Sequence, residues 1–167
     1  MCLVFDVKHL FDFLEMALRV NNPTYIFFLY FPIFFLSTTC QDEFIAGGVT
    51  FKAWDLGGHE AVRQVWDDFL PTTDGVVFVV DAADKARLGE AEDELSALAL
   101  DSALYDVPIA VLFNKGDLPF SMSDQELAEG LHWDDLVRRD GPIAFFRTSV
   151  LRGSGYPEAF QWLSRFC

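Results

Sequence analysis

The chain has 167 residues, 51% of them hydrophobic and 23% charged, and its formal net charge is −14. These values are typical of one globular domain with a buried core, and they exclude a disordered chain. The negative charge argues against nucleic acid as a partner, because a nucleic-acid surface would be basic. The three cysteines are widely spaced and form no disulfide framework or zinc motif, so we expect a reducing compartment.

The amino-terminal part, 1–41, differs in composition from the rest. Nine of the 18 phenylalanines precede Ile45, whereas the range 1–41 holds only three acids and two bases. Nearly all of the negative charge therefore belongs to the remainder. We predict a boundary here, with an atypical Phe-rich hydrophobic segment at 1–41 and a second domain at 42–167.

The Phe-rich part contains two patterns. Charged residues between Lys8 and Arg19 recur at steps of four, three and four, which predicts an amphipathic helix that ends before Pro23. The next run, Tyr25 to Leu36, has twelve residues without a charge. A membrane span needs about 20 such residues, so the run favours a strand, a buried segment or sequence outside the folded domain.

From residue 43 onward, strand and helix patterns alternate. Two strand-like runs flank Gly47-Gly48 and predict a hairpin. Further strands are expected at 75–81, 108–113 and 143–150. Helices are expected at 60–69, 86–100, 123–130 (opened by a capping box, Ser123 with Glu126) and 157–166. This alternation predicts an α/β fold with a mostly parallel sheet and helices on both faces.

A guanine-reading motif follows the strand expected at 108–113. In Asn114-Lys115-Gly116-Asp117, the Asp117 carboxylate can accept two parallel hydrogen bonds from the ring N1–H and the exocyclic amine of guanine. Adenine offers no such pair of donors. Asn114 can tie neighbouring loops together, and the Lys115 stem can lie over the base plane. A simple polar turn after a strand is the alternative.

Two more strand ends carry candidate ligand groups. After the run Val49 to Trp54, Asp55 can hold Mg²⁺ through water and the N–H of Gly58 can approach a terminal phosphate. His59 is then placed to orient an attacking water. The alternative is an ordinary turn with a solvated histidine. At the last strand end, the backbone N–H groups of 148–151 can face the base oxygen.

Together, these motifs resemble those of a Ras-superfamily GTPase, and more narrowly the secretion-associated small GTPases of the COPII coat, in the Sar/Arf branch. The similarity covers about 42–167, and its order and spacing are specific. The residues that carry it are Asp55-Leu56-Gly57-Gly58-His59 (His in place of the usual Gln), Arg63-Gln64-Val65-Trp66, Phe69-Leu70-Pro71, Asp74 to Asp84, Asn114-Lys115-Gly116-Asp117, Thr148-Ser149-Val150-Leu151 and Gly155-Tyr156.

The resemblance implies a P-loop NTPase-like (Ras-type) fold and a GTP–GDP switch that hydrolyses GTP to GDP. It assigns Mg²⁺ to Asp55, the γ-phosphate to Gly58 and the hydrolytic water to His59. It assigns guanine to the remaining motif residues, which are Asn114, Lys115, Asp117, Val150 and Leu151. It also implies vesicle transport from the endoplasmic reticulum to the Golgi, with coat subunits, an exchange factor and an activating protein as partners on the cytoplasmic face of those membranes.

The sequence departs from this family before residue 42. The family has a phosphate loop and a Mg²⁺-binding switch threonine there, but no glycine precedes Gly47 in this chain. The threonine would fall near Thr39, where the surrounding residues match too poorly to assign it. The first strand and helix of the fold are thus expected to be replaced or lost. Unless the run Tyr25 to Leu36 replaces the central strand, two strand edges would be unpaired.

Three interpretations of the segment 1–41 stay open. They are an aberrant start such as a mispredicted exon, part of a non-switching pseudo-GTPase that keeps the partner-facing surface, or an interfacial membrane anchor at 1–36. In each case the phosphate-binding backbone N–H groups, lysine and hydroxyl are missing. We therefore expect this chain to bind nucleotide poorly and its GTPase activity to be impaired.

Overall fold

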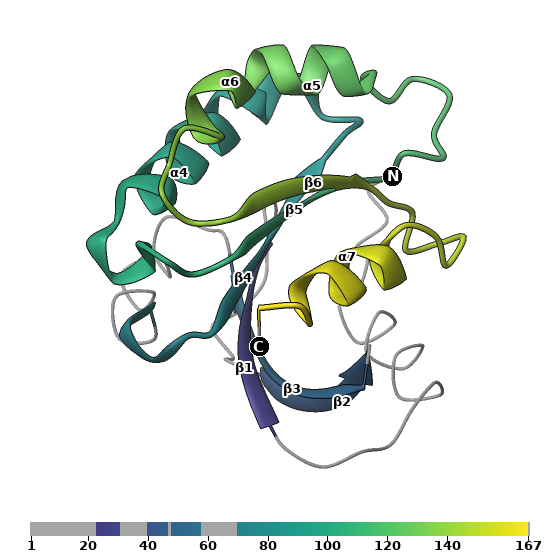
Figure 1. Cartoon of the computed structure of the whole chain (residues 1–167). Coiled ribbons are helices and arrows are strands. Elements are labelled where there is room, and N and C mark those ends of the chain that lie inside the picture. The colour runs from purple at the N-terminus through teal and green to yellow at the C-terminus, as the bar shows by residue number, and fades with distance from the viewer. Residues whose placement is uncertain (1–22, 31–39, 47, 58–69, 167) are drawn as a thin grey trace.

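The computed structural model describes residues 23–30, 40–46, 48–57 and 70–166 (Figure 1). The helices expected within 8–19 and at 60–69 lie outside these ranges. Gly58 and His59 do so as well.

In the described ranges, six strands form one sheet, and their spatial order is β2-β3-β1-β4-β5-β6. Strands β3, β1, β4, β5 and β6 pair in parallel, and β2 pairs with β3 in antiparallel fashion. This confirms the mostly parallel sheet. The strands are β1 (Pro23–Tyr30), β2 (Cys40–Ala46), β3 (Val49–Gly57), β4 (Gly75–Asp81), β5 (Ile109–Asn114) and β6 (Ile143–Arg147).

Strand β1 lies in the middle of the sheet and comes from the Phe-rich segment. It pairs with β3 along its whole length and with β4 from Ile26 to Tyr30. At its carboxyl end, Tyr30 lies opposite Gly57 on one side and Val79 on the other. The run that starts at Tyr25 therefore supplies a central strand, so backbone groups of β3 and β4 that would otherwise be unpaired have partners.

Strands β2 and β3 form the predicted hairpin. Ala46 lies opposite Val49, and Gly48 in the turn has φ +83°, a conformation that favours glycine. Strand β3 continues to Gly57, three residues beyond the predicted end. Asp55 therefore lies within β3 rather than after it, opposite Phe28 of β1.

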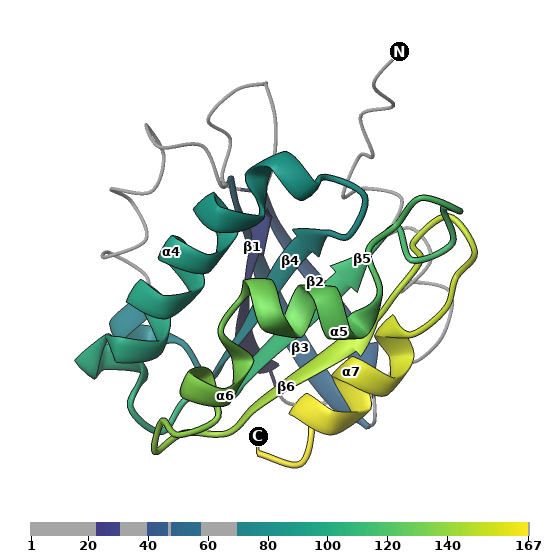
Figure 2. The ribbon, with the colours of Figure 1, turned by 90° about the horizontal axis from the view of Figure 1, so that it is seen from above.

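Among the described residues, three α-helices cover one face of the sheet and one covers the other (Figures 1 and 2). Helices α4 (Leu88–Leu100), α5 (Asp124–Gly130) and α6 (Trp133–Leu136) share a face, and α7 (Tyr156–Leu163) lies on the opposite side. Short 3₁₀ turns complete the fold: η1 (Leu70–Thr72), η2 (Lys85–Arg87) and η3 (Ser102–Leu104).

Several predicted boundaries need correction. The helix expected at 86–100 begins with η2 and becomes α-helical at Leu88, and the last helix ends three residues early, at Leu163. The last strand ends at Arg147 rather than at residue 150, because the chain turns there and Ser149 pairs with Ser154 instead. Helix α6 was not predicted, since four residues are too few to show a helical period.

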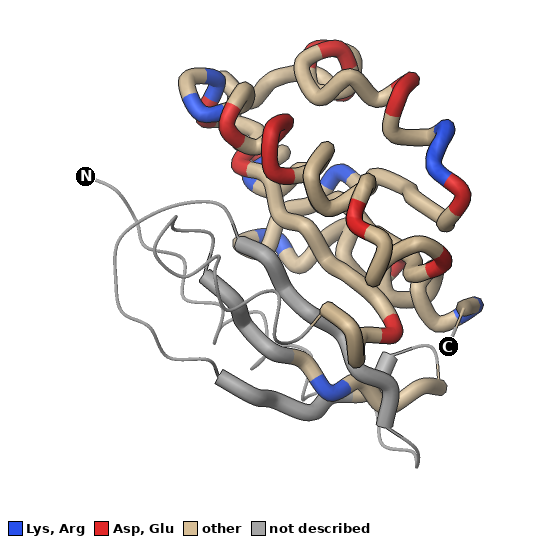
Figure 3. Tube along the Cα trace, turned by 90° about the vertical axis from the view of Figure 1, so that its left-hand side faces the viewer, with Lys and Arg blue, Asp and Glu red and all other residues tan. Residues whose placement is uncertain are grey.

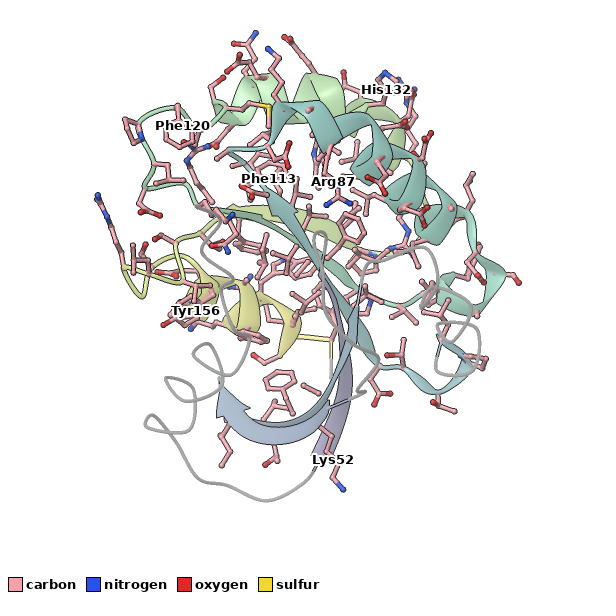
Figure 4. All side chains as sticks on the ribbon, turned by 180° about the vertical axis from the view of Figure 1, so that it is seen from behind. Lys52, Arg87, Phe113, Phe120, His132 and Tyr156 are labelled. Carbon is pink, nitrogen blue, oxygen red and sulfur yellow. The ribbon has the colours of Figure 1, made fainter. Side chains whose placement is uncertain are left out.

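The two faces of the sheet have separate cores. In β4, Val76, Phe78 and Val80 pack under α4 and α5, while Val77 and Val79 pack against α7. Phe113 of β5 belongs to the first core and is fully buried (Figure 4). Because both faces are covered, β4 and β5 read as continuous apolar runs, as is usual for buried parallel strands.

Acidic residues are spread along the helices and loops of the described part of the chain (Figure 3). Among the described residues, no helix is long and apolar enough to cross a membrane.

Candidate functional site

The carboxyl ends of β4, β5 and β6 meet at one edge of the sheet. In the strand register, Asp81 lies opposite Asn114, and Phe113 lies opposite Arg147. The loops that follow β5 and β6 therefore lie side by side, at the edge where open α/β sheets bind ligands. Two of the predicted motifs, 114–117 and 148–151, are brought together here.

Asn114 joins these loops. It is 4% exposed, and its Oδ1 accepts a hydrogen bond from the Val150 N–H at 3.2 Å. Its backbone carbonyl accepts from the Ala82 N–H at 2.9 Å, just after β4. Asn114 thus connects the loops that follow β4, β5 and β6. The sequence predicted that it ties neighbouring loops together.

Lys115 has a left-handed backbone conformation and an ionic partner. Its φ is +63°, which is uncommon and costly for a residue other than glycine. Its ammonium Nζ lies 2.5 Å from Asp81 Oδ2, and Asp81 Oδ1 accepts from the Ala83 N–H at 2.9 Å. The charged end of Lys115 is therefore held on the end of β4, which helps to offset the strained backbone.

The Asp117 carboxylate is largely buried, with a side-chain exposure of 8%. Its Oδ1 accepts from the Ser149 hydroxyl at 2.5 Å, and its Oδ2 lies 3.9 Å from Arg152 Nε. A carboxylate has about four acceptor positions. The positions that remain suit the two parallel donors of a guanine base, so the residues present fit this ligand.

The second loop is closed by hydrogen bonds of its own. Ser149 Oγ accepts from the Arg152 N–H at 3.1 Å, while the Val150 N–H donates to Asn114. Leu151 is 67% exposed at the tip of the turn. The hydroxyl of Thr148 is buried and has no hydrogen-bond partner among the described residues.

A short segment links the guanine motif to α5, and it carries the capping box predicted at Ser123. The Glu126 carboxylate accepts from the Ser123 N–H and hydroxyl, each at 2.9 Å. The backbone hydrogen bond from Ser123 lowers the pKa of Glu126, with its hydroxyl and Lys85 acting in the same direction. Phe120 in this segment is 69% exposed beside the site (Figure 4).

The other predicted ligands belong to β3 and the residues after it. Asp55 lies in β3, which is separated from β5 by β1 and β4. At about 4.8 Å per strand, that separation is roughly 14 Å. The side chain of Asp55, like Gly58 and His59, lies outside the described residues. Within the described part of the chain, no group of three or more His, Cys, Asp or Glu residues could hold a metal ion.

Sequence reasoning missed three side chains that hold this site: Asp81, Ser149 as the partner of Asp117, and Arg147. Asp81 was identifiable as the last residue of a buried strand adjacent to that of Asn114. Ser149 was expected to offer only its backbone N–H to the base, whereas its side chain makes a hydrogen bond to Asp117 that joins two distant loops. Arg147 contacts Ser121, Met122 and Asp124, which lie far back along the chain, so no local pattern indicates these contacts.

This arrangement of sheet, helices and loops is the Ras-like small GTPase fold. The structure aligns with that of the Arl6 (BBS3) small GTPase from Trypanosoma brucei with the bound nucleotide analogue GppNp, at a TM-score of 0.76 and 25% identity. The alignment covers 87% of this chain and all of that one.

Residues 38–167 match the model of the Arf (ADP-ribosylation factor) family, and the chain belongs to this family. It is 34% identical over 135 residues to the small COPII coat GTPase SAR1 of Giardia intestinalis, covering 75% of this chain and 71% of that protein. It is also 34% identical over 116 residues to ADP-ribosylation factor 3 of Arabidopsis thaliana, covering 70% of this chain and 63% of that protein. Arf-family GTPases bind GTP and GDP.

Proposed function

We propose that this chain is a guanine-binding Arf-family protein of vesicle transport between the endoplasmic reticulum and the Golgi, impaired as a GTP–GDP switch. The observation that carries the proposal is the Asp117 carboxylate, which is largely buried and oriented by Ser149 beside the Asn114 loop. A guanine base supplies the two N–H donors that such a carboxylate needs, and adenine does not.

The COPII role rests on sequence features. The stretch Asp55 to His59 has histidine in place of the glutamine found in most relatives, and this replacement favours the secretion-associated branch over the Arf branch. The similarity to SAR1 of Giardia intestinalis supports the same branch. On this proposal, coat subunits, an exchange factor and an activating protein bind the chain at the cytoplasmic face of the membrane.

The impairment follows from the strand at the centre of the sheet. In a phosphate-loop fold, such a strand leads into a glycine-rich loop with a lysine that contacts phosphate. Here β1 ends at Tyr30, and the stretch that follows it, 31–39, contains neither glycine nor lysine. On this proposal the chain keeps the base end of a nucleotide site, whereas the residues that would hold the phosphates and Mg²⁺ differ from the family. If bound there, Mg²⁺ would neutralise phosphate charge.

Calorimetric titration of the full chain with GDP and with ADP, each with and without Mg²⁺, tests this function. We expect weak GDP binding, no ADP binding at the same concentrations, and an affinity that changes less than about twofold with Mg²⁺. Equal binding of GDP and ADP would exclude base recognition. Tight, Mg²⁺-dependent binding of GDP would instead exclude the impairment.

The branch needs a separate test. A purified COPII-branch exchange factor should bind the immobilised chain, while an Arf-branch exchange factor at the same concentration should not. The reverse preference would assign the chain to the Arf branch.

A second candidate function is a non-switching binding module attached to a membrane, and the aromatic sequence after β1 favours it. Flotation with liposomes made of neutral and anionic lipids should then recover the full chain in the lipid fraction. Recovery wholly in the soluble fraction would count against attachment, and measurable Mg²⁺-dependent GTP hydrolysis would exclude a non-switching module.

A further inference from the structure

Arg147, the last residue of β6, makes a set of contacts that the proposed function has not used. Its Nη1 donates to the Met122 carbonyl at 2.9 Å and to Asp124 Oδ1 at 2.7 Å. Its Nη2 donates to Ser121 Oγ at 2.6 Å. One guanidinium therefore holds two residues of the segment between the guanine motif and α5, together with Asp124, the first residue of α5.

The stem of Arg147 lies against the backbone of the guanine motif. A Cβ added to Gly116 would lie 2.8 Å from Arg147 Cγ and 2.9 Å from its Nε, closer than real Cβ contacts come. The Gly116 N–H also donates to the Thr148 carbonyl at 3.0 Å. The middle of the motif, between Lys115 and Asp117, is thus packed between the end of β6 and the Arg147 side chain.

The same contacts connect to the end of β4. The Met122 N–H donates to the Ala82 carbonyl at 2.7 Å, next to the Asp81 carboxylate that binds Lys115. Arg147 therefore completes a closed set of contacts around the motif, made by the ends of β4, β5 and β6. Moving its side chain would release both the segment 121–124 and the backbone at Gly116.

We propose that Arg147 is a positioning residue for guanine recognition, which acts by fixing the backbone at Gly116 and with it the direction of the Asp117 carboxylate. The proposal rests on the proposed function of this site. A guanidinium is suited to this role because it is permanently charged and its planar fork of donors can reach several acceptors at once. A lysine ammonium, with three donors on one atom, cannot span the same acceptors.

The test compares Arg147→Met and Arg147→Lys with a matched control, Arg139→Met. Arg139 also donates to backbone carbonyls, those of Leu104, Val107 and Pro142, and it lies before the start of β6 rather than at its end. Each Met variant removes hydrogen bonds to main-chain carbonyls, so both should destabilise the fold. The two Met variants should differ only in their effect on the guanine motif.

The first readout is amide hydrogen exchange of Gly116 and Leu118 in the chain without nucleotide, under conditions where every variant is folded. The two amides donate to the carbonyls of Thr148 and Lys115. We expect about fivefold faster exchange in Arg147→Met, a smaller increase in Arg147→Lys and no change in Arg139→Met. Unchanged exchange in the Arg147 variants would overturn the proposal.

The second readout is the ratio of the affinities for GDP and IDP, because the hypoxanthine base of IDP lacks the exocyclic amine. The ratio should fall toward one in Arg147→Met and stay at the wild-type value in Arg139→Met. Equal ratios in both variants would overturn the proposal. If the wild-type chain binds no GDP, the proposed function fails, and the exchange readout alone decides whether Arg147 positions the motif.

Discussion

The Asp117 carboxylate is largely buried, because only 8% of its side chain is exposed. Burial of a charge is costly unless hydrogen bonds or an opposite charge compensate it. Ser149 provides one short hydrogen bond, and Arg152 lies 3.9 Å away at its nearest, beyond hydrogen-bonding distance. The carboxylate therefore gains most from a ligand that brings two N–H donors, which is the physical basis for expecting guanine here.

Glu126 allows a pH-dependent prediction at the scale of a single residue. Its pKa in the folded chain is lowered by the hydrogen bonds from Ser123, relative to an ordinary value of 4.5. The ionised Glu126 carboxylate therefore stabilises the folded chain at pH values above its ordinary pKa. This contribution is lost as the pH falls through the lower pKa of the folded chain. NMR titration should give a midpoint for Glu126 below 4.5.

Two variants check this assignment. Ser123→Ala removes the hydroxyl donor and should shift the Glu126 midpoint upward, and loss of the cap should lower the free energy of unfolding by about 1 kcal/mol. Glu126→Gln should lose less stability than the wild type between pH 6 and pH 3 in urea unfolding. An equal loss in the wild type and in Glu126→Gln would show that the capping carboxylate contributes nothing.

At the scale of an element, β1 determines whether the sheet is complete. Its sequence begins with Pro23, which is tolerated as the first residue of a strand, and continues with aromatic and branched residues that favour strands. Between them, β3 and β4 offer backbone partners on both sides. An apolar run whose composition differs from that of the domain thus forms an inner strand of the sheet, where loss of a strand would reduce stability most.

Proline at Leu29, near the carboxyl end of β1, should reveal this role. Leu29 lies opposite Leu56 and Phe78, so Leu29→Pro removes a donor from a doubly paired strand. We expect the free energy of unfolding to fall by at least about 1–3 kcal/mol in urea denaturation. Ser102→Pro is the control, because proline is tolerated at the first position of a helical turn such as η3. A stable Leu29→Pro variant would show that β1 does not pair as described.

At the scale of the whole molecule, the parts that sequence predicted are those with local patterns. Continuous apolar runs predicted β4 and β5, Gly47-Gly48 predicted the hairpin and Ser123 with Glu126 predicted the cap. The place of β1 was not predictable, because a short apolar run without a period does not specify its neighbours. The contacts of Asp81, Ser149 and Arg147 depend on strand order, which brings distant residues to one edge.

The central claim is that this edge of the sheet reads a guanine base through Asp117. The most direct measurement is equilibrium binding of GDP and XDP to the wild type and to Asp117→Asn. The amide NH₂ can donate to the 2-carbonyl of xanthine, whereas it cannot replace the acceptor that the amine of guanine requires. We predict that the wild type prefers GDP and that the variant prefers XDP, each by about tenfold or more. The same preference in both proteins, with the variant folded, would contradict the claim.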